Sequence, residues 1–267
     1  MADQLQYVYA VVLPTTAVAV APAGIDGRSV DLVVGDDIAA LVSAVDAGVY
    51  GSNIDDRVAD VAWLAPRATA HDAVLTWASD VGAVVPLPLL SLFRSRAAVR
   101  SMLAERRDEL RVLLDQVGRG REFGIRIFRL DDELRRELAS FSAPVAALES
   151  EVAAASSPGQ SFLLSRKLDA ARKDEIRRVG AEVAEAAYNE LASRSLASTQ
   201  DALPTPNAGQ AGAAVLNASF LVAHDRIDDF RAAVTSFLRD HERRGFRLEF
   251  TGPWPPYHFT RGAANVR

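Results

Sequence analysis

Apolar residues recur along this chain with two periods, and the alternation between the two restricts the fold more than any other feature. At residues 5–13 apolar side chains stand at every second position, as in a β-strand with one face on a core. At residues 96–117 they recur at steps of three and four, as in an amphipathic helix. Because the two patterns succeed each other along the chain, the sequence predicts an α+β fold.

After the opening strand, the pattern predicts a hairpin, a helix and an edge strand. Gly35-Asp36 lies between β-branched runs at 30–34 and 38–42, and glycine at the first central position suits a type II′ turn. An amphipathic helix is expected from Pro66 to Val81, since proline is a good first helical residue. Two prolines limit residues 84–92 to an edge strand or an extended loop, because proline cannot donate to a ladder.

The next helix begins near Arg96 and ends at Gly118 and Gly120, which we interpret as the boundary between two domains. Residues 198–212 are rich in Pro, Gly, Ser and Asn and are predicted to form a loop. The other expected elements are a strand at 123–127, helices at 131–141, from Pro144, and from Ser157 to Leu191, a strand at 215–222, a helix at 225–244 and a strand at 246–250.

With its long helical stretch removed, the second half resembles a split βαβ or ferredoxin-like arrangement that lacks one strand. Residues 1–120 are therefore predicted to form an N-terminal α+β domain. Residues 121–251 are predicted to form a ferredoxin-like domain with a helical extension at about 142–197, followed by a C-terminal tail at 252–267 that is rich in proline and aromatic residues.

Composition excludes several classes of protein. The chain is 49% hydrophobic and 24% charged, so it can bury a core and is neither fibrous nor disordered. Its 30 basic and 35 acidic residues give no basic footprint for nucleic acid. There is no cysteine, which excludes disulfides and thiolate metal sites and fits a cytoplasmic location.

Neither of the two long uncharged stretches predicts a membrane segment. Between Asp3 and Asp26 there is no charge, but no Lys or Arg precedes the stretch and Pro14 divides it, so a signal peptide is not expected. Residues 81–93 contain two prolines and are shorter than the roughly 20 residues of a spanning helix.

The search for catalytic and metal-binding motifs favours structural explanations. Gly118 to Gly124 resembles a phosphate loop, but it follows a helix and precedes a strand, the reverse of the order that a dinucleotide loop needs. The four histidines are scattered and are interpreted as core or boundary residues rather than metal ligands. Turns and helix caps explain the three aspartate pairs. The histidines are His71, His224, His241 and His258, and the pairs are Asp36-Asp37, Asp55-Asp56 and Asp131-Asp132.

A basic cluster on the helical segment after residue 93 is predicted to be a solvated, salt-bridged face, because four acids interleave with it. The bases are Arg94, Arg96, Arg100, Arg106, Arg107 and Arg111, and the acids are Glu105, Asp108, Glu109 and Asp115. No enzyme, cofactor or metal is expected from these motifs, and neither nucleic acid nor a membrane is expected as a partner.

Neither a solvated surface nor ordinary core packing explains the composition of the segment from Thr251 to Phe259. Its prolines are expected to stop the last strand and to impose an extended tail, and its large rings must dock on something. Packing across the chain's own domains and binding of a partner both remain open. The structural or partner-binding candidates are Pro253, Trp254, Pro255, Pro256, Tyr257 and Phe259.

These residues carry a family resemblance. The run from Gly252 to Phe259, preceded by 215–222, resembles the C-terminal signature of the gas vesicle protein F/L family. Other stretches that resemble the family, in the same order, are 7–11, 71–75, 85–87, 121–126 and 159–163. The chain departs from the family at Pro88-Leu89-Leu90-Ser91, where members usually have an Arg-Phe-Gly-Thr-like stretch, and at Phe123 and Arg126, where they have Trp and Lys.

The resemblance implies two α+β domains, the second a modified ferredoxin-like fold, with the tail packing between them. It also implies a non-enzymatic accessory or minor structural protein, located in the cytoplasm and at the gas vesicle. The implied partners are the small hydrophobic shell protein and other gas vesicle accessory proteins, which it would bind during assembly. The alternative is a cytoplasmic ligand-binding regulatory module with a ferredoxin-like domain.

Overall fold

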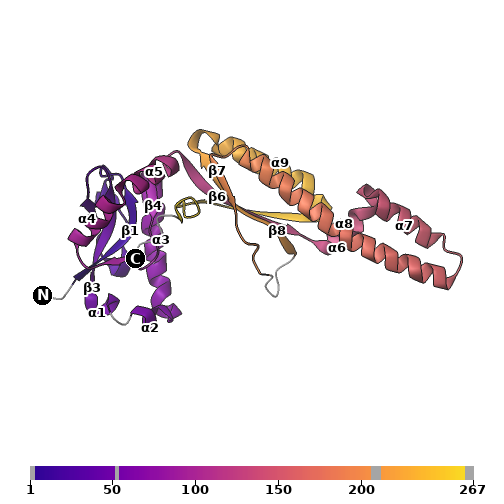
Figure 1. Ribbon diagram of the computed structural model, residues 1–267, viewed down its shortest axis with the longest axis horizontal. Helices are drawn as coiled ribbons and strands as arrows, with labels where there is room; N and C mark the ends of the chain where they lie inside the picture. Colours follow the sequence, from indigo (N-terminus) through magenta and orange to yellow (C-terminus); the bar gives the residue numbers. More distant parts are fainter. Residues whose placement is uncertain (1–3, 52–53, 206–211, 262–267) are drawn as a thin grey trace. The chain divides into compact units, whose positions relative to one another are not determined.

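The computed structural model describes residues 4–51, 54–205 and 212–261, and the chain divides into two compact units (Figure 1). The first unit combines Met1–Glu122 with Pro253–Arg267, and the second is Phe123–Gly252. Both units contain a β-sheet and helices, which confirms the expected mixture of α and β structure.

The sheet of the first unit has β1 (Gln4–Val12) at its centre. Its order is β2-β3-β1-β4, and β5 (Leu92–Phe93) also pairs with β1. Strand β1 is antiparallel to each of its three neighbours. The remaining strands are β2 (Asp31–Val34), β3 (Ala39–Asp46) and β4 (Val84–Pro86).

Helices cover both faces of this sheet. Val8 and Val11 of β1 pack in a core with α4 (Arg96–Glu105) and α5 (Arg107–Val117), whereas Tyr7 and Tyr9 pack in a second core with α3 (Val61–Val81). The sequence predicted one buried face for this strand, and the central position of β1 buries both. Short helical segments complete the unit: η1 (Val18–Val20), η2 (Ile25–Gly27), α1 (Ala47–Tyr50) and α2 (Ile54–Val58).

The predicted hairpin between β2 and β3 is confirmed, but its turn differs from the prediction. The Gly35 N–H donates to the Ile38 carbonyl over 2.9 Å, so Asp36 and Asp37 are the central residues. Positive φ does not occur at Gly35, Asp36 or Asp37, which is inconsistent with a type II′ turn.

Helix boundaries in the first unit also differ from the sequence pattern. Helix α3 begins five residues before Pro66, because the Asp60 side chain caps it by accepting from the Ala62 N–H over 2.9 Å. Pro66 thus lies inside the helix. The predicted helix from Arg96 is divided at Arg106 into α4 and α5, and Gly118 ends α5 as expected.

The sheet of the second unit has the order β7-β8-β6-β9. Its strands are β6 (Gly120–Arg129), β7 (Ala197–Gln200), β8 (Ala213–Ala223) and β9 (Phe246–Trp254). One core joins the sheet to its helices through residues such as Phe123, Phe220 and Phe230. The helices are α6 (Asp131–Phe141), α7 (Ala143–Ala153), α8 (Pro158–Ala192) and α9 (Ile227–His241), with η3 (His224–Arg226) and η4 (Glu242–Arg244) beside α9.

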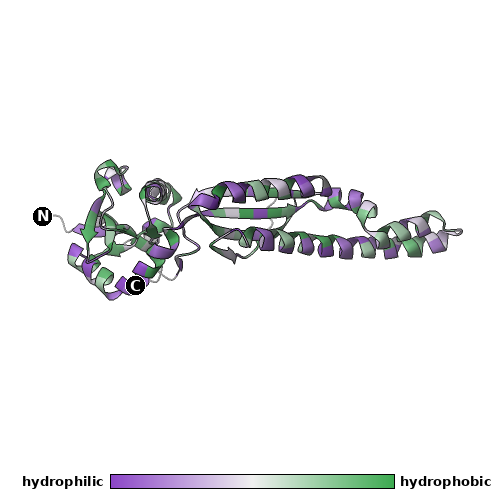
Figure 2. Ribbon diagram, turned by 90° about the horizontal axis from the view of Figure 1, so that it is seen from above, coloured by the Kyte–Doolittle hydropathy of each residue, from purple (hydrophilic) through white to green (hydrophobic). Residues whose placement is uncertain are grey.

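Figure 2 shows hydrophilic and hydrophobic residues alternating along these helices, as expected for helices with one face on a core. The helices predicted at 131–141, from Pro144 and from Ser157 are confirmed, and the Ser157 side chain accepts from the Gln160 N–H at the start of α8.

Two predictions about the strands of the second unit were wrong. The expected loop at 198–212 begins with β7, which pairs antiparallel with β8; residues 206–211 of that loop lie outside the described residues. The last strand does not stop before the prolines, because β9 continues through Gly252, at φ 108°, and Pro253 to Trp254. A proline is tolerated there because β9 is an edge strand.

Within the described ranges, none of the helices combines the length and the apolar character that crossing a membrane requires.

Candidate interaction site at the C-terminal segment

The C-terminal segment, Pro253–Arg261, belongs to the first unit, and after Trp254, where β9 ends, it folds into turns. The Tyr257 N–H donates to the Pro255 carbonyl over 2.7 Å, and the Phe259 N–H donates to the Pro256 carbonyl over 3.3 Å. The Thr260 hydroxyl donates to the same Pro256 carbonyl over 2.9 Å. Prolines donate no hydrogen bond, but their carbonyls accept here. The extended conformation predicted for this segment therefore holds only as far as Trp254, and it was wrong for the turns that follow.

A buried carboxylate fixes the middle of the C-terminal segment. Glu122 is only 2% exposed, and it accepts a hydrogen bond from the His258 N–H over 3.0 Å. Its other oxygen contacts Nδ1 of the His258 ring, which is partly exposed. A carboxylate so deeply buried is tolerated only when it is paired and hydrogen-bonded, so this contact fixes the segment to Glu122 within the first unit.

Apolar contacts fix the segment on either side of His258. Pro255 and Pro256 are buried. The Phe259 ring packs on the core formed by β1 with α4 and α5. Pro255, Pro256 and part of the Phe259 ring therefore pack on the chain itself, whereas Trp254 and Tyr257 stay largely exposed.

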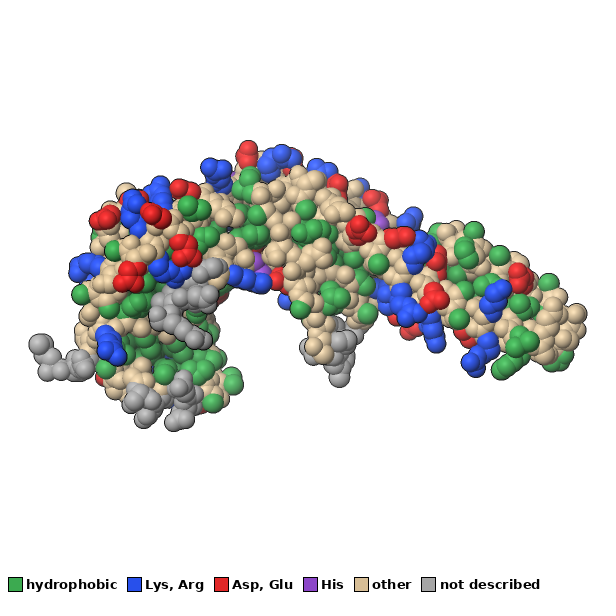
Figure 3. Space-filling view, in the orientation of Figure 1, with side chains coloured by type: hydrophobic (Ala, Val, Ile, Leu, Met, Phe, Trp, Pro, Cys, Tyr) green, Lys and Arg blue, Asp and Glu red, His purple; other side chains and the backbone are tan. Residues whose placement is uncertain are grey.

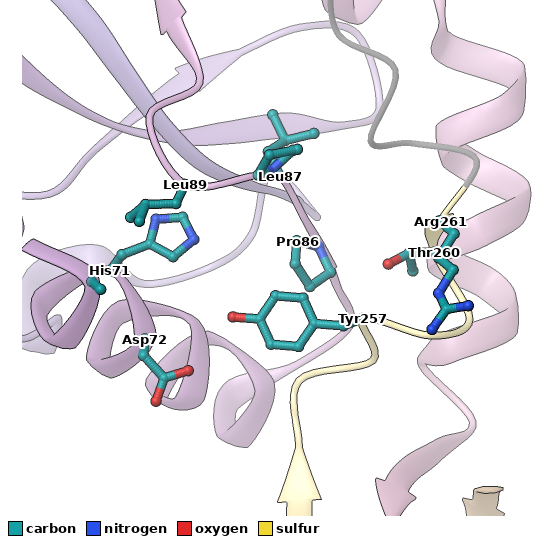
Figure 4. A pocket seen from close by; sticks show the side chains of 10 residues that line it. His71, Asp72, Pro86, Leu87, Leu89, Tyr257, Thr260 and Arg261 are labelled. Atoms are coloured by element: carbon teal, nitrogen blue, oxygen red, sulfur yellow. The ribbon is translucent and has the colours of Figure 1, made fainter. Parts of the chain in front are cut away.

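Tyr257 lies between the C-terminal segment and α3. Figure 4 shows its hydroxyl pointing toward the side of α3 that carries His71 and Asp72, with its ring beside Pro86. Burial, together with the negative charge and hydrogen bond of Asp72, raises the pKa of the Tyr257 hydroxyl. The phenol therefore stays protonated at neutral pH and can donate to a carboxylate.

His71 connects α3 to β1 and to the loop after β4. Its Nδ1 lies 2.8 Å from the Tyr7 hydroxyl, whose oxygen accepts from the Leu90 N–H over 3.2 Å. Burial lowers the pKa of His71 to about 4, and a hydrogen bond with the backbone of Leu87 opposes this shift. His71 is therefore a neutral, hydrogen-bonded core residue, which agrees with the structural interpretation of the histidines.

A cavity of about 370 Å³ lies beside Tyr257 (Figure 4). Apolar walls come from Pro86, Leu87 and Leu89, and Asp72 and Arg261 supply charges. Among its described lining residues none is Cys, Ser or Lys, and His71 is already engaged. The arrangement therefore suits the binding of an apolar group better than acid–base or nucleophilic chemistry.

The loop that walls this cavity holds a strained residue. Leu90 has φ 65°, the left-handed region that favours glycine. It follows Leu89 and precedes Ser91, whose hydroxyl donates to the Pro88 carbonyl over 2.7 Å. Hydrogen bonds to Tyr7 and within the loop hold this conformation against its cost.

The six candidate residues occupy different environments. Pro253 and Trp254 are exposed at the end of β9, with 45% of Trp254 accessible. The prolines at 255 and 256 are buried, Tyr257 is 38% exposed and Phe259 is partly buried. All six thus lie at the end of β9 or in the turns that follow it, and the Tyr257 ring also lines the cavity. Their role in binding a partner stays a prediction, as does packing of residues 252–267 between two domains.

The other sequence candidates have structural roles. The basic cluster forms ion pairs, including Arg106 with Glu109 at 3.0 Å and Arg107 with Asp37 at 2.9 Å. Asp131 opens α6 and pairs with Arg129. The side chains of Asp55 and Asp56 lie outside the described residues. Among the groups that the structure describes, no cluster of His, Asp or Glu could hold a metal ion.

Sequence reasoning missed Glu122 and Tyr7. Glu122 lies on the same strand face as the exposed Arg126, and nothing in the local pattern separates the two. The sequence pattern places Tyr7 on a strand, but it does not predict the hydrogen bond between Tyr7 and His71, which lies 64 residues away. Only contacts distant in sequence distinguish these polar residues from ordinary surface or core positions.

Known proteins are similar to this chain over nearly its whole length. A model of the family described as gas vesicle synthesis protein GvpL/GvpF matches residues 5–261. Gas vesicle protein L of Streptomyces sp. (strain CB03234) is 32% identical, with 96% of this chain and 93% of that protein covered. Gas vesicle protein F of Haloferax mediterranei is 44% identical over 45 residues, which are 17% of this chain and 21% of that protein.

Two solved structures share the fold. The crystal structure of GvpF from Anabaena sp. PCC7120 has a TM-score of 0.70 and 16% sequence identity. That of GvpF from Microcystis aeruginosa has a TM-score of 0.67 and 17% identity. Each comparison covers 96% of this chain and 98% of the other.

Proposed function

This chain belongs to the GvpL/GvpF family of gas vesicle proteins, and on this premise we propose that it is an accessory protein that binds the small shell protein during vesicle assembly. The observation that carries the proposal is the family match over residues 5–261, which leaves almost none of the chain for another role. Its site of action would be the cytoplasm and the growing gas vesicle.

A physical reason supports binding of the shell protein. A shell subunit with an apolar, gas-facing surface would aggregate before assembly unless a partner covered that surface. A partner that lowers the concentration of exposed shell protein would favour ordered growth over aggregation. Other accessory proteins of the vesicle are the second class of partner that we propose.

We propose a binding role without catalysis. The cavity beside Tyr257 has apolar walls, and the His71 imidazole already has hydrogen-bond partners in Tyr7 and the backbone of Leu87. The exposed Trp254 and the rim of the cavity at Tyr257 are the proposed contact points of the C-terminal segment, because large aromatic side chains are enriched at interfaces.

We also propose that the second unit is a modified ferredoxin-like domain. Its element order is β6, three helices, β7, β8, α9 and β9, and its sheet order is β7-β8-β6-β9. Strand β7 supplies the strand that the sequence pattern lacked, and α7 with most of α8 forms the helical insertion.

Capture and deletion experiments test the assembly role. A tagged chain co-expressed with the small shell protein should retain it through purification, and a clean deletion should abolish or distort the vesicles. Normally shaped vesicles in a deletion strain that lacks any paralogue would refute the proposal.

The cavity favours one alternative, a ligand-binding regulatory module. Its volume of about 370 Å³ lies within the range of small-molecule sites. Leu87→Trp should fill the cavity. If the chain regulates vesicle formation through a small ligand, this variant should change vesicle number in the cell while capture of the shell protein stays at the wild-type level.

A further inference from the structure

The end of the helical extension carries an uncharged, apolar surface that packing within the second unit does not use. Although 24% of the chain is charged, no charged residue occurs from Val152 to Ser165. This range, which we call the hairpin tip, contains the end of α7, the connection to α8 and the first two turns of α8.

Two large apolar side chains of the hairpin tip face solvent. Phe162 is 63% exposed and Leu163 is 69% exposed. The buried residues of α8 begin only at Leu168, which packs in the core with Val145 and Leu148 of α7. The start of α8 therefore presents an aromatic and an aliphatic side chain together to solvent.

Capping interactions hold the hairpin tip in one conformation. The Gln160 N–H donates to the Ser157 hydroxyl over 3.3 Å, and the side-chain oxygen of Gln160 accepts from the N–H and hydroxyl of Ser156, each over 3.2 Å. Pro158 begins the helix with a fixed φ. Phe162 and Leu163 therefore stand on a preformed helical turn, so binding there would not have to order a loop.

Uncompensated positive charge borders the apolar surface. Arg166 and Lys167 are exposed one turn after Phe162 and Leu163, and neither forms an ion pair with any residue in the described ranges. Arginines farther along α8 are paired, as in Arg172 with Glu149 at 2.7 Å. Figure 3 shows green hydrophobic and blue basic side chains together at this end of the helical extension.

We propose that the hairpin tip is a surface that binds the small shell protein, in addition to the contact points of the C-terminal segment, and that it binds an apolar face of the shell protein bordered by carboxylates. The inference rests on the proposed function. Phe162 and Leu163 cover part of the apolar face, while Arg166 and Lys167 pair with the carboxylates and orient the contact. The charge at the border favours a partner with acidic residues beside its apolar surface over a second copy of this chain, which would bring the same cations together.

Capture of the co-expressed shell protein by the tagged full-length chain tests the apolar contact. Phe162→Gln/Leu163→Gln should reduce the captured amount by at least about tenfold, because exposed anchors of an interface carry much of its binding energy. Glutamine keeps the helix propensity, so the far-UV spectrum and melting temperature should not change. Val61→Gln/Val112→Gln removes two side chains that are 75% and 66% exposed elsewhere, and it should capture the wild-type amount.

Charge reversal tests the border. Arg166→Glu/Lys167→Glu should reduce capture of the shell protein by about three- to tenfold. The remaining capture should depend less on salt concentration than capture by the wild type does. Arg94→Glu/Arg100→Glu reverses two exposed cations of the first unit as a matched control and should leave capture unchanged.

The outcomes separate the inference from the proposed function. If the wild type and the Phe162→Gln/Leu163→Gln variant capture equal amounts of shell protein, the inference about the hairpin tip is overturned and the assembly role stays intact. No capture by the wild type would overturn both. Loss of self-association in the variant, measured by light scattering, would identify a second copy as the occupant and overturn the proposal. Binding of the wild type, but not the variant, to vesicles of anionic phospholipid would also overturn it.

Discussion

Acidification should destabilise the first unit through His71. The pKa of this imidazole is about 4 in the folded chain, against an ordinary value of 6.5. Between these two values the unfolded chain binds a proton that the folded chain does not bind, so the free energy of unfolding falls as the pH falls. The stabilisation is complete above pH 6.5 and is lost progressively toward pH 4.

The size of the effect follows from the shift. Each pKa unit corresponds to about 1.4 kcal/mol, so the loss near pH 4 is about 3 kcal/mol. The residue is 4% exposed, so solvent screens this energy little. A loss of that size is a large part of the roughly 5–15 kcal/mol that stabilises a typical domain.

Tryptophan fluorescence during urea unfolding measures the first unit selectively, because Trp63, Trp77 and Trp254 all belong to it. His71→Gln removes the titrating group, and its free energy of unfolding should depend on pH less steeply than that of the wild type. His241→Gln, in the second unit, should retain the wild-type slope. Equal slopes for the wild type and His71→Gln, or an NMR titration with a pKa near 6.5 for His71, would refute the reasoning.

Three further predictions concern the C-terminal segment and the loop beside the cavity. Glu122→Ala should lower the free energy of unfolding by about 2–4 kcal/mol, because the partly buried His258 N–H loses its acceptor; Glu105→Ala, at an exposed position, should change it by less than about 0.5 kcal/mol in the same urea titration. Trp254→Ala should cost no more than about 1–2 kcal/mol, since 45% of the residue is exposed, and a cost of 4 kcal/mol or more by the same measurement would indicate full burial. Leu90→Gly should be about 1–2 kcal/mol less destabilising than Leu89→Gly, because glycine relieves the positive φ only at position 90; equal losses in thermal unfolding would contradict this.

Periodicity and caps in the sequence predict most elements of the second unit, because these signals act between residues within one or two helical turns. The start of α8 is an example: Ser157, Pro158 and Gln160 specify a helix N-terminus by themselves, and the structure places it there. The family resemblance, carried by the run from Gly252 to Phe259, is likewise a property of the sequence alone, and the family match confirms it.

Features that depend on distant partners could not be predicted in this way. Strand β7 has the unpatterned sequence Ala-Ser-Thr-Gln, and only its pairing with β8 makes it a strand. The continuation of β9 through Pro253 depends on its edge position in the sheet. The local sequence predicted a loop at β7 and the end of a strand before Pro253. Hydrogen bonds within the sheet outweighed these local preferences at both places.

The candidate site illustrates the same division. Composition alone required the aromatic residues of the C-terminal segment to dock, and the sequence could name Trp254, Tyr257 and Phe259 as the residues concerned. How far each of them is exposed was decided by contacts over more than a hundred residues, such as that of Glu122 with His258. A carboxylate and an imidazole so far apart in the chain carry no local signal of their pairing, because the energy that joins them exists only once the tertiary fold has removed the carboxylate from water.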